Sequence, residues 1–132
     1  MPGETNLNTL IREMKPELNA GEYVFSLTNS REHETATDTI CLFQEREGIT
    51  LILPKQKADQ AQLPYPGTYA WITLTVHSSL EAVGLTAAVS QALTNANISC
   101  NIVAAYFHDH LFVPSKDAEK ALAVLQKLAQ SK

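Results

Sequence analysis

The chain has 132 residues, 45% of them hydrophobic, and a formal net charge of −4, which suits one compact unit or two small modules. The acidic excess lies in the first half, because residues 1–63 contain six Lys/Arg and ten Asp/Glu, whereas residues 64–132 contain four of each. This balance argues against binding of nucleic acid, whose backbone requires a face rich in Lys and Arg.

The amino terminus and the short apolar runs indicate a cytoplasmic protein. The opening Met-Pro-Gly-Glu-Thr-Asn has neither the basic nor the apolar region of a signal peptide. Runs such as residues 102–107 are too short to cross a bilayer. Cys41 and Cys100 are far apart, which indicates neither a disulfide framework nor a zinc knuckle. We therefore expect no membrane partner and no cofactor.

The first half predicts a short helix followed by strands. Apolar residues at helical spacing follow Asn6, a plausible helix cap. Further along, residues that favour strands are separated by turn residues. The predicted elements are a helix over 7–14, a strand over 22–27, a hairpin with strands at 39–45 and 49–53, and a weak helix over 55–63.

Pro64-Tyr65-Pro66-Gly67 is the strongest linker signal in the chain. We therefore place a first module at 1–63, a linker at 64–67 and a second module at 68–132. Leu53-Pro54 and Val113-Pro114 each end a predicted strand and lie sixty positions apart. This similarity indicates a diverged internal duplication.

The second half predicts the element order βαββα. Ser78-Ser79-Leu80-Glu81 has the form of a capping box, so we expect a helix to begin at Ser79. Alternating and apolar patterns give the remaining elements. They are a strand over 69–77, the helix over 79–96, a strand over 98–107, a tight connection at 108–110, a returning strand over 111–113 and a final helix after Ser115.

Charged residues are almost absent between Pro64 and Ser115, where only Glu81 and Asp109 occur. A neutral segment of this length is expected to be mostly buried, both in its own core and against another domain or subunit. We therefore predict a homodimer.

The predicted order also brings the two acidic residues together. If the returning strand lies between the other two, as in the ferredoxin-like split βαβ unit, the start of the Ser79 helix and the 108–110 connection share one end of the sheet. Free N–H groups at a helix start suit a carboxylate, and the Asp109 side chain suits an ammonium. Together they would complement the two poles of a free amino acid.

The strand, the Ser-Ser-Leu-Glu-Ala-Val-Gly-Leu helix start and the Ala-Tyr-Phe-His-Asp-His-Leu-Phe-Val-Pro hairpin together resemble an ACT domain of the CASTOR-type subgroup. The resemblance is specific over 69–114, and residues 5–63 resemble the partner module of small bacterial tandem ACT proteins. It implies an α+β fold of two ferredoxin-like modules, each an antiparallel sheet with helices on one face. The second half ends in a helix, so the module's last strand must be missing or come from another part of the chain.

The resemblance further implies a non-enzymatic regulatory protein that binds an amino acid or another small effector at an interface between modules, and that acts on a protein on a separate chain. The resemblance implies neither a metal site nor a catalytic residue. By position it assigns ligand contacts in the strand-to-helix turn and the hairpin: Ser78, Ser79, Leu80, Glu81, Val83, Gly84, Leu85, His108, Asp109 and His110.

These residues also have structural explanations. Ser78 and Glu81 fit simple helix capping, Asp109 fits a turn, and Gly84 fits close packing of a helix on a sheet. Three hypotheses stay open: an amino-acid sensor, a structural or oligomerisation module without a ligand, and a small metal-dependent hydrolase that uses His108 and His110. The hydrolase is ranked last, because no H-E-x-x-H, G-x-S-x-G or phosphate-binding loop occurs in the sequence. The sensor is favoured by the resemblance and by the predicted convergence of the Ser79 helix start with Asp109.

Overall fold

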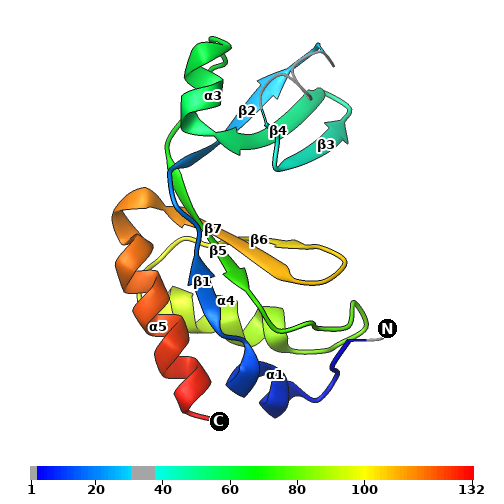
Figure 1. The fold of residues 1–132 in the computed structure, drawn as a ribbon, viewed down its shortest axis with the longest axis vertical. Helices are drawn as coiled ribbons and strands as arrows, with labels where there is room; N and C mark the ends of the chain where they lie inside the picture. The colour runs from blue at the N-terminus through cyan, green and yellow to red at the C-terminus, as the bar shows by residue number, and fades with distance from the viewer. Residues whose placement is uncertain (1–2, 31–37) are drawn as a thin grey trace. The chain divides into compact units, whose positions relative to one another are not determined.

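The computed structural model describes residues 3–30 and 38–132. Its contacts divide the chain into two packing units, one formed by the segment up to Asn19 together with Ala70–Lys132, and one formed by Ala20–Tyr69. Both combine helices with strands that pair antiparallel (Figure 1), which confirms the predicted α+β class. The module boundaries at 63 and 68 stay a sequence-based prediction.

The larger unit contains most of the elements that the second half predicts, preceded by one helix and one short strand from the amino-terminal segment. In chain order they are α1 (Leu7–Glu13), β1 (Pro16–Leu18), β5 (Tyr69–Leu74), α4 (Leu85–Asn95), β6 (Asn101–Ala104), β7 (Asp109–Pro114), the 3₁₀ turn η1 (Ser115–Asp117) and α5 (Ala118–Gln130).

The strands of this unit follow the order β1-β5-β7-β6. The returning strand β7 therefore lies between β5 and β6, which is the predicted split βαβ arrangement. On the other side of β5, β1 pairs antiparallel with it, with Pro16 opposite Leu74. The strand that the second half lacks is thus supplied by the amino-terminal segment.

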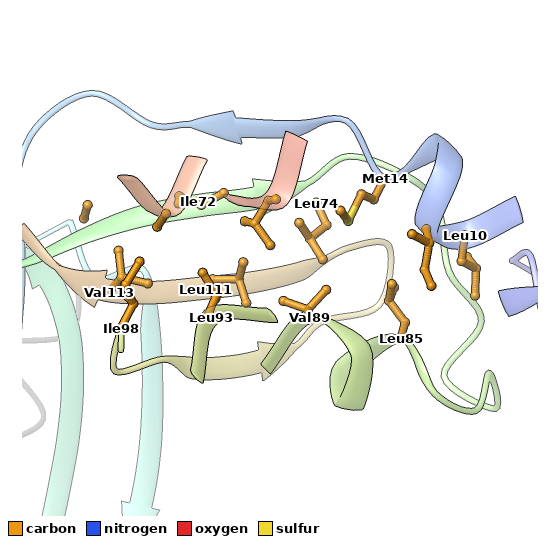
Figure 2. Close-up of a cluster of buried hydrophobic side chains, with 14 residues drawn as sticks. Leu10, Met14, Ile72, Leu74, Leu85, Val89, Leu93, Ile98, Leu111 and Val113 are labelled. Carbon is orange, nitrogen blue, oxygen red and sulfur yellow. The ribbon is translucent and has the colours of Figure 1, made fainter. Parts of the chain in front are cut away.

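The core of the larger unit lies between this sheet and its helices. Leu85, Val89 and Leu93 recur along one face of α4 and are at most 3% exposed. Figure 2 shows these side chains directed toward Leu111 and the neighbouring core residues. Helix α5 contacts α1, α4, β1 and β7. Burial of this apolar face is the main force that holds α4 on the sheet.

Several predicted boundaries differ from the observed ones: the strand predicted over 69–77 ends at Leu74, and the strand predicted over 98–107 covers only Asn101–Ala104. Two further corrections concern the candidate site. The helix begins at Leu85 rather than at Ser79, and residues 78–84 form a loop. The capping-box pattern does not start the helix, because Gly84, with φ of 106°, occupies the N-cap. The connection in the hairpin precedes Asp109, which is the first residue of β7, and His110 is the second.

The expected burial of the neutral segment is incomplete within this unit. Four large apolar side chains stay more than half exposed, namely Leu80 (66%), Val83 (82%), Tyr106 (68%) and Phe107 (56%). They belong to the loop before α4 and to the β6–β7 connection.

The smaller unit is a three-stranded sheet in the order β3-β4-β2, with one helix against it. Val24, Leu51 and Leu53 are fully buried and pack with Ala58 of the helix. Ser26 Oγ donates a hydrogen bond to the carbonyl of Pro64, which fixes the end of this unit. Its elements are β2 (Tyr23–Thr28), β3 (Cys41–Glu45), β4 (Gly48–Pro54) and α3 (Lys55–Gln60).

Candidate ligand-binding site

A cavity of about 130 Å³ lies in the larger unit between the start of α4 and the β6–β7 hairpin. Its walls therefore come from the two segments that the sequence predicts to converge. The described residues that line it are Ser78, Ser79, Leu80, Ala82, Gly84, Leu85, Thr86, Ala104 and Asp109.

The loop before α4 is held by the amino-terminal segment. Glu4 donates its backbone N–H to the carbonyl of His77 over 2.9 Å and accepts the N–H of Ser79 over 3.0 Å. The two chain segments form an isolated parallel bridge between Glu4 and Ser78. An added Cβ at Gly3 would lie 2.5 Å from the carbonyl carbon of Ser78, so only glycine permits this approach. This wall of the cavity thus depends on residues that precede α1.

The first turn of α4 carries unused hydrogen-bond donors. Its N-cap, Gly84, provides no side-chain cap. The first helical bond runs from the N–H of Ala88 to the carbonyl of Gly84. Leu85 and Thr86 line the cavity, and their N–H groups find no acceptor among the residues that the structure describes. A helix start of this kind attracts an anionic group through its N–H donors and its dipole.

Asp109 faces this helix start across the cavity. It is 9% exposed, and its carboxylate makes no hydrogen bond or ion pair with any residue in the described part of the chain. Burial raises the pKa of Asp109, and the nearby His110 and His108 oppose that shift to a smaller extent. A carboxylate that burial partly desolvates and no cation neutralises is costly, and a cation bound in the cavity would lower that cost.

The two hairpin histidines are turned to other partners. The Nδ1 of His108 lies 3.2 Å from the carbonyl of Val76 and donates to it. The Nδ1 of His110 accepts the indole N–H of Trp71 over 3.0 Å, which places the proton of the neutral ring on Nε2. Neither ring lines the cavity.

The structure thus brings six of the ten predicted contacts to one cavity: Ser78, Ser79, Leu80, Gly84, Leu85 and Asp109. Glu81 and Val83 belong to the same loop but do not line the cavity. Ser79 Oγ accepts the backbone N–H of Glu81 instead of capping a helix. Their role as ligand contacts stays a prediction.

Sequence reasoning missed three lining residues, Ala82, Thr86 and Ala104. Thr86 would have been found had Gly84 been taken as the N-cap, because the first turn of the helix then begins at Leu85. Ala104 follows from its register opposite Asp109 in the β6–β7 pair.

The described residues give little support to covalent or metal chemistry. Burial raises the pKa of Cys100 to about 11, so its thiol stays protonated at neutral pH. No group of three or more His, Cys, Asp or Glu side chains lies close enough to hold a metal ion in residues 3–30 and 38–132. No helix in the same ranges is long and apolar enough to span a membrane.

Comparison with protein families decides what kind of fold surrounds this cavity. One family model described as an ACT domain matches residues 2–70, and a second model with the same description matches residues 68–127. This chain is a tandem ACT-domain protein. The assignment to the CASTOR-type subgroup is compatible with these matches and stays a resemblance. ACT domains are regulatory, non-catalytic modules, and membership of the family supports a regulatory, amino-acid-binding role in general terms.

Solved structures agree with this assignment. A protein of unknown function from Vibrio cholerae, described as a possible transport protein, is 45% identical, with a TM-score of 0.85 over 93% of the tandem ACT chain and 95% of its own. The ligand-free regulatory subunit of aspartate kinase from Thermus thermophilus is 12% identical, with a TM-score of 0.65 over 86% and 95% of the two chains. At this identity, the similarity to the aspartate kinase subunit shows a shared fold and nothing further. The comparison with curated proteins gives no match.

Proposed function

We propose that this tandem ACT-domain protein is a non-enzymatic sensor that binds a free amino acid in the cavity between the start of α4 and β7. The α-carboxylate accepts the free N–H groups of Leu85 and Thr86, and the α-ammonium pairs with Asp109. The observation that carries the proposal is the unpartnered carboxylate of Asp109, a residue that is 9% exposed, in the same cavity as an uncapped helix start.

The opposite charges of the two walls set the orientation of the ligand. A helix start repels an ammonium, and a carboxylate side chain repels another carboxylate, so only one orientation satisfies both poles. Binding then stabilises the packing of the loop at 78–84 against β7. A shift between two packings of this loop is the signal that a regulated partner can detect.

Thermal unfolding of the purified protein against the common amino acids tests this proposal. A ligand at about 100 times its dissociation constant adds about 2.7 kcal/mol to the free energy of unfolding. We expect at least one amino acid to raise the melting temperature, and Asp109→Asn to abolish that increase. Glu17→Gln is the control, because Glu17 is exposed on β1 of the same unit and does not line the cavity. If no amino acid changes the melting temperature, the sensor proposal is wrong.

A second candidate, a structural or oligomerisation module, is favoured by the exposed apolar side chains Leu80, Val83, Tyr106 and Phe107. Apolar groups that cluster on one loop and one hairpin commonly mark a protein interface. We propose that they pack against a second copy of the chain, so that the sensor is a homodimer. The two candidates differ in the ligand: a pure oligomerisation module forms the dimer but shows no stabilisation by any amino acid.

The mass in solution tests the dimer. We expect sedimentation at micromolar concentration to give twice the monomer mass, and Val83→Asp to weaken the association, because a charge replaces an 82% exposed apolar side chain in the interface. Leu27→Asp, at a 51% exposed position of the smaller unit, is the control. A monomer at this concentration would contradict the proposal.

A further inference from the structure

The size of the cavity limits the ligand that it can enclose. Its volume is about 130 Å³, which is comparable to a cavity of about 150 Å³ that holds one benzene molecule. Benzene has about as many non-hydrogen atoms as alanine, so the α-ammonium, the α-carboxylate and a very small side chain fill this space. This limit on the ligand rests on the proposed amino-acid-binding function of the cavity.

The charge of the walls limits the ligand further. Asp109 is the only ionisable side chain among the described lining residues, and the other polar lining groups are the hydroxyls of Ser78, Ser79 and Thr86. Once Asp109 pairs with the α-ammonium, a charged ligand side chain finds no counter-charge. Enclosing an unpaired charge is strongly unfavourable, so an acidic or basic side chain has to extend into water, where the site offers it no counter-charge.

The space beside the two charged walls is bounded partly by small residues. Ala82, Gly84 and Ala104 leave this space open, and Leu80 and Leu85 give it an apolar surface. The whole cavity measures only about 130 Å³. A long side chain therefore has to leave the cavity, where it loses most of its contacts.

We infer that the cavity selects small, uncharged amino acids, namely glycine, L-alanine and L-serine. These ligands place both poles on the two charged walls and bring no further charge. Larger aliphatic and charged amino acids bind at least about tenfold more weakly, which is the lower end of the discrimination that one methylene gives in a hydrophobic pocket.

Isothermal titration with glycine, L-alanine, L-serine, L-leucine, L-lysine and L-glutamate tests this inference on the full chain. We expect the first three to bind and each of the last three to bind about tenfold more weakly or not at all. If leucine, lysine or glutamate binds as tightly as alanine, the size and charge inference is wrong while the sensor proposal stands. If none of the six binds and no other amino acid changes the melting temperature, both are wrong.

A cavity-filling variant separates size from other causes of selectivity. Ala104→Val adds two methyl groups to the cavity wall at the position that pairs with Asp109 across β6 and β7. We expect this variant to weaken alanine binding more than glycine binding. Ala105→Val is the matched control, because Ala105 is exposed and does not line the cavity. An unchanged ratio of the two affinities in Ala104→Val would overturn the inference, and circular dichroism of both variants checks that they fold.

Discussion

The indole N–H of Trp71 donates to Nδ1 of His110 over a distance of 3.0 Å, which links β5 to β7 directly beside Asp109. Thr73 Oγ1 lies 3.2 Å from the same nitrogen and accepts a hydrogen bond from Asn19 Nδ2. Partial burial lowers the pKa of His110, His108 lowers it further, and Asp109 opposes the shift. The neutral imidazole is therefore the form that the folded state prefers.

The first prediction concerns acid stability. Because the pKa of His110 is lower in the folded protein than in the unfolded chain, its contribution is complete above the unfolded value of about 6.5 and is lost as the pH falls below it. His110→Gln keeps an acceptor for Trp71 but does not titrate, so we expect a smaller loss of stability between pH 7.5 and pH 5.5. Urea unfolding at the two pH values measures it. An equal loss in both proteins would show that His110 is not responsible.

The second prediction concerns Asp109 in the absence of ligand. Its pKa is raised by burial, so the folded state holds the proton more tightly than the unfolded chain does, and this contribution to stability declines as the pH rises through the folded pKa. Asp109→Asn removes the buried charge. We therefore expect it to raise the melting temperature of the ligand-free protein at pH 7.5, and to raise it less at pH 4.5.

The control for this effect is again Glu17→Gln, which removes an exposed carboxylate and should change the melting temperature little at either pH. If Asp109→Asn instead lowers the melting temperature at pH 7.5, the carboxylate has a stabilising partner in solution. A gain in stability together with a loss of binding would identify Asp109 as a residue that serves the ligand rather than the fold.

The third prediction concerns Gly84. A residue with a side chain would be strained at φ of 106°, and its Cβ would approach Leu7 to 2.9 Å. We expect Gly84→Ala to lower the free energy of unfolding by about 1–3 kcal/mol. The double variant with Leu7→Ala should recover only part of this loss, because it removes the contact but not the backbone strain. Urea unfolding measures both.

Gly67→Ala is the matched control for backbone strain. An added Cβ at Gly67 meets no atom within 4 Å, and its φ is not positive. The substitution should leave stability unchanged or raise it slightly, since alanine restricts the unfolded chain. Equal destabilisation by the two alanine substitutions would contradict this interpretation of Gly84.

The fourth prediction concerns the core that positions α4. Leu93 is fully buried and packs in the cluster that Figure 2 shows. We expect Leu93→Ala to lower the free energy of unfolding by about 2–5 kcal/mol, because it removes apolar contacts and leaves a cavity. Val83→Ala, at an 82% exposed position, should change it by less than about 0.5 kcal/mol in the monomer. Chemical denaturation of both variants tests the difference.

Much of the larger unit could be predicted because the spacing of apolar residues within single segments of the sequence identifies its strands and helices. The alternation in Tyr69–Leu74 and the apolar stripe of Leu85, Val89 and Leu93 indicate a strand and a helix without any tertiary information. The split βαβ rule then places the helix start near Asp109, and the cavity between them agrees with that geometry.

The start of α4 could not be predicted as well, because two local signals compete. Ser78 and Glu81 have the spacing of a capping box, whereas Gly84 adopts the positive φ that ends the preceding loop. The bridge between Glu4 and Ser78 holds the loop in an extended path, and no local pattern reveals a partner more than seventy residues away.

The origin of β1 has a practical consequence for anyone who divides the gene. Pro16–Leu18 covers one side of β5, so a fragment that begins at residue 68 would leave the backbone of Ile72, Thr73 and Leu74 unpaired along that side. An open strand of this kind recruits other chains into aggregates. Expression of the carboxy-terminal half alone should therefore yield insoluble material, even though an ACT-domain family model matches residues 68–127 by themselves.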